Sequence, residues 1–551
     1  MSGRTTFRFD LSADVPPAAE LGRVHLVAIG GSGMSGVARM LLAAGVPVSG
    51  SDRTDSPTLR ALEAEGARVF VGHDAAHLEG VSTVVVSSAI PEDNPELAAA
   101  RELGLRVLHR AQGIAALLHG RPAVAVAGAN GKTTTSAMTT VALQAAGLEP
   151  GYVIGAPLSV ASPQTGAASA AVTVPPDGTP ADATTIPTNA APGAPGAPVV
   201  VEADESDGTF VVYRPQVAVV TNVQADHLDF YGTVEEVERA YAEFVDTVQP
   251  GGLLVTNADD PGAARLAAHA RHTRPDLQVL TWGTGTGVTG GDDEGAGADP
   301  DVLMRDVTSR GMTARATLWM RSTVGPFGEG QELEVVVPVP GEHNAHNATA
   351  ALLAATVGLG ADPERVLAGL AAFPGAHRRF ERVGAAGGVE VVDDYAHNAP
   401  KVAAVVAAAR SAADGRRVVV AFQPHLFSRT QDFADGFAAG LAGADVLVLV
   451  PIYGAREKQE QYPQVTAQLL ADRVEALGGP ERVVTAGSLE ATPGVLAEIV
   501  RTGDLVVTVG AGDVTTVGPL LLELLGDRVG SVGAGVDAGE AAADGGGVSR
   551  T

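Results

Sequence analysis

The chain has 551 residues, 64 acidic against 37 basic side chains, a formal net charge of −27 and no cysteine. This length predicts about three or four domains, and the missing cysteine excludes disulfides and thiolate chemistry. The acidic balance argues against a broad nucleic-acid surface. Because we find neither a signal-peptide pattern nor an apolar run near the roughly 20 residues of a membrane span, we expect a cytoplasmic protein that binds neither nucleic acid nor membranes.

A strand, a glycine turn and a helix form the first predicted unit. The apolar run 24–29 leads into the turn Gly31-Ser32-Gly33-Met34-Ser35-Gly36, and a second run ends near Asp52. An acidic residue about 20 residues after such a turn completes the fingerprint of a dinucleotide-binding, Rossmann-like unit. The same turn can hold any diphosphate, so the pattern does not identify a nicotinamide. We predict that residues 1–121 form this domain.

The segment 122–147 predicts a second phosphate site. A buried-strand run is followed by Gly128-Ala129-Asn130-Gly131-Lys132-Thr133-Thr134 and then by a helix-forming stretch. Glycines let backbone N–H groups close on an anion, Lys132 can reach the β- and γ-phosphates, and the Thr133 hydroxyl suits Mg²⁺. The loop has the short Gly-x-x-Gly-Lys-Thr form, since Val126 stands where the longer P-loop has its first glycine. We therefore expect ATP to bind here.

Polar residues follow two further predicted strands of this domain. The stretch Glu202-Ala203-Asp204-Glu205-Ser206-Asp207 comes after one apolar run, and His227 follows the next. Such positions hold metal ligands in a phosphate-loop fold, so Glu202 and His227 are candidates for Mg²⁺. A solvated acidic loop and a structural histidine are the alternatives. Ahead of these strands, residues 161–198 are rich in Ala, Pro, Thr and Gly, and we expect a disordered insertion there.

The second domain, 122–373, ends after an alanine-rich helix that begins near Asn344 and Asn347. These asparagines share a helix face, and their amides can pair with an adenine edge or cap the helix. Residues 374–527 again alternate strands and helices, which predicts a second Rossmann-like sheet without a phosphate loop of its own. The Gly-, Ala- and Asp-rich tail 528–551 is expected to be disordered. The predicted fold is therefore α/β with three domains.

These motifs, in this order, resemble the Mur ligase family from Val24 to Leu525. The motifs that carry the resemblance are Gly30-Gly31-Ser32-Gly33-Met34-Ser35-Gly36, Gly50-Ser51-Asp52, Ser87-Ser88-Ala89-Ile90, Gly131-Lys132-Thr133-Thr134-Thr135, Glu202 to Asp207, Thr221-Asn222, Ala225-Asp226-His227, His343 to Asn347, Arg378-Arg379-Phe380 and Phe422-Gln423-Pro424-His425. The resemblance implies an ATP- and Mg²⁺-dependent ligase of peptidoglycan precursor synthesis. ATP would phosphorylate the lactyl carboxylate of UDP-N-acetylmuramate, and an amine would then displace the phosphate. The likeness is greatest to the branch that adds L-alanine.

The resemblance also implies a role for each motif. Lys132 binds the phosphates and the acyl-phosphate transition state, the loop from Gly128 to Thr134 surrounds ATP, and Asn344 and Asn347 contact its adenine. The magnesium positions are Thr133, Glu202 and His227. The UDP-sugar positions are Gly31, Ser32, Gly33, Met34, Asp52, His73, Ser88, Arg378 and Arg379. His425 and Arg429 match the amino-acid end, and with Lys132 and His227 they are the expected catalytic residues.

Three departures from the family pattern concern mainly the third domain. Ala129-Asn130 stands where this branch usually has Thr-His, His397-Asn398-Ala399-Pro400 replaces His-His-Pro, and Leu426 replaces an arginine. The related ligase that joins a cell-wall tripeptide to the same UDP-sugar shares nearly every motif and stays an alternative. A nicotinamide-dependent oxidoreductase, suggested by the first domain alone, and an inactive UDP-sugar sensor are others. The sequence leaves open whether the protein is a monomer or a homodimer.

Overall fold

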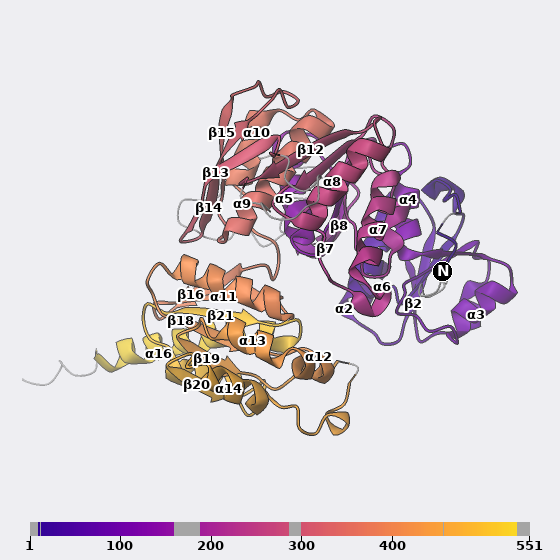
Figure 1. The fold of residues 1–551 in the computed structure, drawn as a ribbon. Helices are drawn as coiled ribbons and strands as arrows, with labels where there is room; N and C mark the ends of the chain where they lie inside the picture. Colours follow the sequence, from indigo (N-terminus) through magenta and orange to yellow (C-terminus); the bar gives the residue numbers. More distant parts are fainter. Residues whose placement is uncertain (1–8, 12, 159–187, 286–298, 456, 537–551) are drawn as a thin grey trace, which may run out of the picture. The chain divides into compact units, whose positions relative to one another are not determined.

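The computed structural model describes residues 9–11, 13–158, 188–285, 299–455 and 457–536 (Figure 1). The chain divides into two compact units, Met1–Thr308 with Ala314–His377 and Ser309–Thr313 with Arg378–Thr551. The boundary after His377 lies just past residue 373, the predicted end of the second domain. Apart from residues 309–313, the first two predicted domains therefore fall within one unit, where each has a sheet of its own.

Parallel strands form the first sheet, in the order β3-β2-β1-β4-β5. The strands are β1 (Val24–Val27), β2 (Val48–Asp52), β3 (Arg68–Val71), β4 (Thr83–Val86) and β5 (Arg106–His109), with helices α1 (Ser32–Ala43), α2 (Pro57–Ala64), α3 (Pro95–Glu102) and α4 (Arg110–Leu118). Every residue of β1 is buried, as expected for a parallel strand covered on both faces. Because β1 pairs with β2 on one side and β4 on the other, the glycine turn leaves the sheet at its topological switch point.

The middle sheet has the order β15-β14-β13-β12-β11-β10-β6-β9-β7-β8. Its strands are β6 (Ala123–Ala127), β7 (Gly151–Leu158), β8 (Thr188–Ala191), β9 (Val199–Glu202), β10 (Val217–Val220), β11 (Leu253–Asn257), β12 (Gln278–Gly283), β13 (Val302–Arg310), β14 (Thr313–Met320) and β15 (Glu332–Val337). Its helices are α5 (Lys132–Ala145), α6 (Leu228–Tyr231), α7 (Val234–Asp246), α8 (Pro261–Thr273), α9 (Glu342–Leu353) and α10 (Pro363–Ala371). β6 runs parallel between β9 and β10, so the ends of these three strands meet at one edge of the sheet.

The structure corrects the predicted insertion 161–198 at its C-terminal end. Residues 159–187 lie outside the described residues, but β8 pairs antiparallel with β7 at the edge of the sheet. Ala190 of β8 is buried and packs on α1, where a Cβ built on Gly36 would lie 3.1 Å from the Ala190 Cβ. The composition of this stretch is typical of a loop, but the small residues of β8 are ordered because β7 supplies their hydrogen bonds and Gly36 leaves room for them.

Unit 2 contains a sheet of order β16-β17-β21-β18-β19-β20, parallel except for the β16–β17 pair. The strands are β16 (Glu381–Ala386), β17 (Val389–Asp394), β18 (Val418–Phe422), β19 (Val446–Leu449), β20 (Arg482–Thr485) and β21 (Leu505–Val509), and the helices are α11 (Ala399–Ala413), α12 (Phe427–Asp432), α13 (Ala434–Leu441), α14 (Ala467–Ala476), α15 (Thr492–Ile499) and α16 (Val517–Val536). The prediction of a disordered tail from 528 is wrong as far as Val536, because α16 continues to that residue. Residues 537–551 lie outside the described part.

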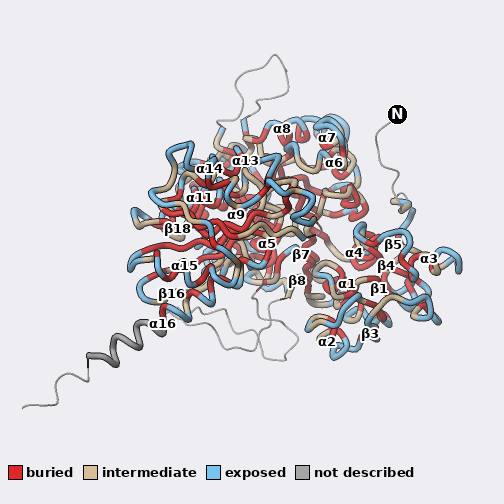
Figure 2. Tube along the Cα trace, turned by 90° about the horizontal axis from the view of Figure 1, so that it is seen from below, coloured by how far each residue is buried: buried red, intermediate tan, exposed pale blue. Residues whose placement is uncertain are grey.

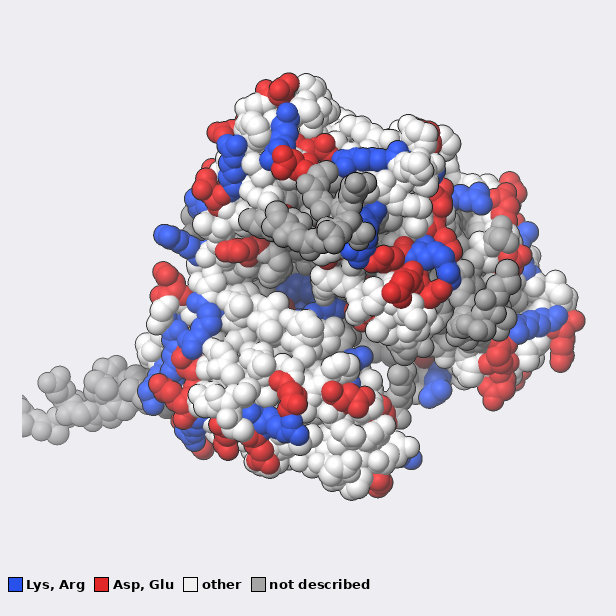
Figure 3. Space-filling model, viewed as in Figure 1, with Lys and Arg blue, Asp and Glu red and all other residues white. Residues whose placement is uncertain are grey.

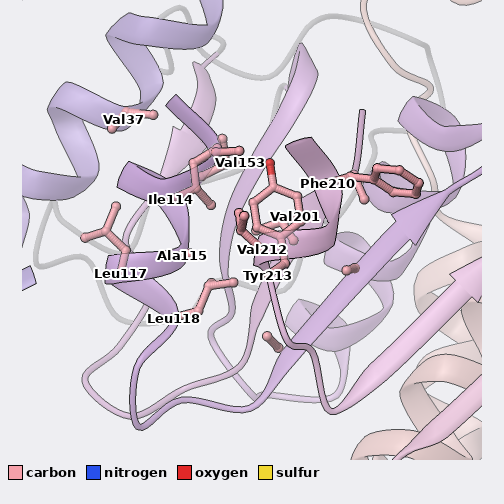
Figure 4. Close-up of a cluster of buried hydrophobic side chains, with 14 of the residues drawn as sticks. Val37, Ile114, Ala115, Leu117, Leu118, Val153, Val201, Phe210, Val212 and Tyr213 are labelled. Carbon is pink, nitrogen blue, oxygen red and sulfur yellow. The ribbon is translucent and has the colours of Figure 1, made fainter. Parts of the chain in front are cut away.

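One apolar core runs through both sheets of unit 1. It joins side chains of α1 and α4, such as Val37 and Ile114, to Val153 of β7, Val201 of β9 and Phe210 (Figure 4). Such residues are buried together with the central strands (Figure 2). Each large apolar side chain buried in this way contributes about 1.5–3 kcal/mol. The glycine turn and the phosphate loop are therefore carried by sheets that share a core.

The surface carries both signs of charge. On the face shown in Figure 3, Asp and Glu side chains are interspersed with Lys and Arg. Among the described residues, no helix combines the length and the apolar character needed to cross a membrane.

Candidate active site

The phosphate loop, residues 128–131, links β6 to α5 between the ends of β9 and β10. Gly128 (φ 133°) and Gly131 (φ 87°) adopt backbone conformations that favour glycine. A Cβ on Gly128 would lie 2.0 Å from Thr221 Oγ1, and one on Gly131 would lie 2.6 Å from Asn347 Oδ1. Conformation and space therefore both require glycine at these two positions.

The end of β10 holds this loop in place. Asn222 Oδ1 accepts a hydrogen bond from the Asn130 backbone N–H at 2.9 Å, and Asn222 Nδ2 donates to the Asn130 carbonyl at 3.0 Å. The Thr221 hydroxyl donates to the same carbonyl. Thr221 and Asn222 thus fix the shape of the loop through its backbone.

Lys132 forms a buried ion pair that sequence reasoning did not anticipate. Its Nζ lies 2.7 Å from Glu205 Oε1, and the two side chains are 14% and 2% exposed. Nζ also donates to the Gly128 carbonyl at 2.7 Å. Burial alone would lower the pKa of Lys132, but the carboxylates of Glu205, Glu202 and Asp204 outweigh it and raise that pKa. The ammonium group is therefore held in its charged form.

Of the three predicted magnesium positions, Thr133 and Glu202 contact each other, and His227 lies near Glu205. Thr133 Oγ1 donates to Glu202 Oε1 at 3.0 Å, and Glu202 Oε2 accepts from the Gly155 N–H at 2.6 Å. His227 Nε2 lies 3.9 Å from Glu205 Oε1. Within the described residues, no group of three or more His, Asp or Glu side chains could hold a metal ion unaided. Mg²⁺ commonly binds one or two carboxylates together with waters and substrate phosphates, so Thr133 and Glu202 fit a metal that arrives with a nucleotide.

Asn344 and Asn347 are buried in the first turns of α9, each 6% exposed. Asn347 Nδ2 donates to Asn344 Oδ1 at 3.0 Å, and Asn344 Nδ2 donates to the Pro340 carbonyl at 2.7 Å. The structure therefore brings Asn347 against Gly131 of the phosphate loop and Asn344 behind it. Their contact with adenine stays a prediction.

The glycine turn of the first sheet is similarly braced. Gly31 is the N-cap of α1, and Gly33 lies in the first turn of that helix. The side chain of Met34 is 4% exposed and belongs to the apolar core of unit 1. Asp52 Oδ2 accepts from the Gly30 N–H at 2.9 Å, which places this predicted UDP-sugar residue beside the turn. The side chain of Ser32 lies outside the described part of the chain.

His73 belongs to a buried cluster that no sequence pattern indicated. Oε2 of Glu96 accepts from the Ser51 hydroxyl at 2.6 Å and lies 2.8 Å from His73 Nδ1. Oε1 lies 2.7 Å from His77 Nδ1 and 3.3 Å from His25 Nε2. Burial alone would raise the pKa of Glu96, but the adjacent His25 ring and hydrogen bonds with Ser51 and His77 lower it to about 2. Glu96 therefore holds His73 in a fixed orientation.

The acidic stretch also reaches the first sheet. Ser88 donates to Asp207 Oδ2 at 2.6 Å and lies 3.1 Å from His109 Nε2. Since His109 Nδ1 accepts from the Ala111 N–H at 3.2 Å, its Nε2 is the atom that donates to Ser88. The loop from Glu202 to Asp207 thus contacts two predicted sites. Its Glu205 pairs with Lys132 beside the phosphate loop, and its Asp207 binds the predicted UDP-sugar residue Ser88.

Unit 2 contains the remaining predicted residues. The Arg378 guanidinium donates to Asp393 Oδ2 at 3.0 Å and to the Gly510 carbonyl, so its fork is engaged within its own sheet. The Arg379 guanidinium lies 5.3 Å from the centre of the Tyr395 ring. Their predicted contact with the UDP-sugar stays a prediction.

The residues predicted to bind the amino-acid substrate also lie close together in unit 2. Arg429 Nη1 lies 3.5 Å from His425 Nδ1, and the His425 ring is 5.9 Å from that of His397. Burial, together with the nearby cations, lowers the pKa of His397 to about 4. Leu426, which stands where the family pattern has an arginine, is buried and 7% exposed. Asn398 accepts from the Lys401 N–H as the N-cap of α11, a position that asparagine favours.

Comparison with known protein families gives a match for each predicted domain. A model described as "Mur ligase family, catalytic domain" matches residues 23–121, "Mur ligase middle domain" matches 126–355, and "Mur ligase, glutamate ligase domain" matches 378–512. The three matches follow the chain in the order that the sequence motifs predict.

Curated relatives and solved structures extend over nearly the whole chain. The UDP-N-acetylmuramate–L-alanine ligase of Kineococcus radiotolerans is 51% identical over 524 residues, covering 94% of this chain and 99% of its own. That of Thermobifida fusca is 45% identical over 92% of this chain and 97% of its own. The crystal structure of UDP-N-acetylmuramate–alanine ligase from Thermotoga maritima matches with a TM-score of 0.68 at 25% identity, covering 93% and 99%. A murein peptide ligase from Psychrobacter arcticus shares the fold, with a TM-score of 0.61 at 22% identity, covering 92% and 99%.

Proposed function

Given that this chain belongs to the Mur ligase family, we propose that it is an ATP-dependent amide ligase that joins L-alanine to the lactyl carboxylate of UDP-N-acetylmuramate. The reaction is a cytoplasmic step in the synthesis of peptidoglycan precursors. Relatives named for this reaction cover nearly the entire chain, which supports alanine as the acceptor. The recycling ligase that uses a tripeptide stays the alternative.

A single arrangement in unit 1 carries the proposal. The protonated Lys132, the Thr133 hydroxyl and the Glu202 carboxylate lie together at the ends of parallel strands. The sheet that holds them shares a core with a second sheet, whose glycine turn fits a diphosphate. This combination suits a reaction between ATP and a nucleotide-linked acid.

The residues act mainly by positioning reactants and neutralising charge. The lactyl carboxylate attacks the γ-phosphorus of ATP, which forms an acyl phosphate and releases ADP. The alanine amine then adds to the acyl carbon, and the tetrahedral intermediate expels phosphate. Lys132 offsets the negative charge on the transferring phosphoryl group. Thr133 and Glu202, with His227 nearby, would hold Mg²⁺, which when bound neutralises charge on the phosphates.

The alanine end of the reaction is assigned to unit 2. A small amino acid is best held by its carboxylate, which leaves the amine free, and arginine forms bidentate contacts with carboxylates. Arg429 beside His425 offers such a group. Leu426 stands where the family pattern has an arginine, so a second cation has no counterpart at that position.

Phosphate release from ATP tests the proposal directly. We would assay the protein with UDP-N-acetylmuramate and each of the twenty amino acids, and separately with the cell-wall tripeptide. L-alanine should give the fastest release, glycine and L-serine slower release, and omission of the UDP-sugar none. Faster release with the tripeptide than with alanine would assign the protein to the recycling branch.

A further inference from the structure

An arginine outside every predicted site lies directly over the glycine turn. Arg110 opens α4 immediately after β5. A Cβ built on Gly33 would lie 2.4 Å from Arg110 Nη1 and 3.3 Å from its Cζ. The guanidinium therefore occupies the space above the second glycine of the turn, which explains why no larger residue fits at Gly33 unless Arg110 moves.

Among the described residues, this arginine forms an ion pair only with Asp204, and the pairing is loose. Arg110 Nη2 lies 3.7 Å from Asp204 Oδ2, which is longer than a hydrogen bond, and the two side chains are 29% and 44% exposed. Exposed pairs of this kind stabilise a fold weakly. A ligand anion can therefore replace Asp204 at little cost.

Asp204 itself lies in the field of two cations. Its Oδ2 lies 3.7 Å from Arg110 Nη2, and its Oδ1 accepts a hydrogen bond from the Ser206 N–H at 3.1 Å. Lys132 faces the predicted ATP phosphates, and Arg110 faces the turn predicted to hold a diphosphate. The acidic loop thus provides each cation with a carboxylate before a substrate brings its own negative charge.

We propose that Arg110 is a further substrate-binding residue, whose guanidinium holds the diphosphate of UDP-N-acetylmuramate against the glycine turn, and that Asp204 is its counterion in the ligand-free protein. This inference rests on the function proposed above. Backbone N–H groups of the turn and the start of α1 attract phosphate oxygens, and the planar fork of arginine binds two such oxygens at once. In a protein with a net charge of −27, a local cation is needed to hold a substrate of the same sign.

Four variants test the proposal by calorimetric titration with UDP-N-acetylmuramate in the absence of ATP. Arg110→Ala and Arg110→Gln remove the cation, and the glutamine keeps much of the packing if alanine proves too disruptive to fold. Asp204→Asn breaks the same ion pair but leaves the arginine. Arg101→Ala is the matched control, because Arg101 pairs with Glu92 on the surface of the same sheet domain.

Loss of a charge-assisted contact should weaken binding by roughly ten- to a hundredfold in both Arg110 variants. The loss should be as large for UDP as for the complete sugar nucleotide, because both carry the diphosphate. Asp204→Asn and Arg101→Ala should bind UDP-N-acetylmuramate at least as tightly as the wild type. The KM for ATP should stay unchanged in the Arg110 variants if any turnover can be measured at saturating UDP-sugar.

Equal weakening by Arg110→Gln and Asp204→Asn would overturn the inference, since the arginine would then act only through the ion pair. Unchanged affinity of Arg110→Gln, with normal wild-type binding, would also overturn it while leaving the proposed function intact. A wild-type protein that binds no UDP-N-acetylmuramate would instead refute the proposed function, and the inference with it.

Discussion

Replacing Glu205 by glutamine removes the charge beside Lys132 while nearly keeping the size of the side chain. The pair is well buried, with 14% of Lys132 and 2% of Glu205 exposed and 2.7 Å between Nζ and Oε1. Oε2 of Glu205 is buried without a hydrogen-bond partner among the described residues. The carboxylate is thus compensated mainly by the lysine, and the substitution tests that interaction directly.

The expected loss of folding stability depends on which hydrogen bonds Lys132 and the new glutamine can still form. Breaking a buried pair costs about 3–5 kcal/mol when the remaining charge is left without a partner. Lys132 keeps the Gly128 carbonyl at 2.7 Å, and a glutamine oxygen can still accept a hydrogen bond. We therefore expect a loss of about 1–2 kcal/mol in the free energy of unfolding. At roughly 2–4 °C per kcal/mol for domains of moderate size, the Tm should fall by several degrees.

The pH dependence has a definite sign. The pKa of Lys132 is raised above its ordinary value of 10.5, because neighbouring carboxylates outweigh the opposite effect of burial. A raised lysine pKa stabilises the fold fully below the unfolded pKa, and this stability is lost as the pH rises through the folded value. The wild type should therefore lose stability more steeply than Glu205→Gln above pH 10.5.

Differential scanning calorimetry of the ligand-free protein measures both effects, with Glu63→Gln as a control. Glu63 pairs with Arg60 on the surface, where both side chains are about half exposed, so losing this pair should cost little stability.

Lys132→Ala should abolish turnover and leave Glu205 buried without its partner. The double variant Lys132→Ala with Glu205→Gln should then be more stable than Lys132→Ala alone. If Glu205→Gln kept the wild-type Tm and pH profile, or the double variant gained no stability, the reasoning would be refuted.

Three further predictions concern the other residues. Glu202→Ala and His227→Ala should each raise the Mg²⁺ concentration needed for half-maximal phosphate release, and an unchanged magnesium titration would contradict their placement. The pKa of Glu96 is lowered to about 2 against the effect of burial, so its charged form stabilises the fold above its ordinary pKa of 4.5, and this stability is lost as the pH falls toward 2. The Glu96→Gln variant should therefore unfold more easily near neutral pH and lose less further stability in acid. Circular dichroism would follow both effects. Arg429→Ala should raise the KM for L-alanine by roughly ten- to a hundredfold with little change in the KM for ATP, whereas equal KM values for alanine would reject this carboxylate site.

The local sequence pattern was sufficient to predict both glycine turns and the α/β fold. Glycine turns that join an apolar run to a helix need only neighbouring residues, since strand and helix periodicities and left-handed backbone angles are encoded within a few positions. The strand–turn–helix units at Gly31 and Gly128 are therefore present as predicted. The same local view failed at β8, where pairing with β7 orders a stretch whose composition is typical of a loop.

Only the tertiary structure decided which charged groups meet. The acidic stretch from Glu202 to Asp207 has several carboxylates, and the path of its backbone turns Glu202 toward Thr133 and Glu205 toward Lys132. Arg110 over Gly33, and Glu96 among three histidines, likewise join segments far apart in the chain. Sequence periodicity indicates which face of an element is buried, but a partner at long range is selected by strand order, by the direction of each loop and by the cost of burying a charge without a counterion.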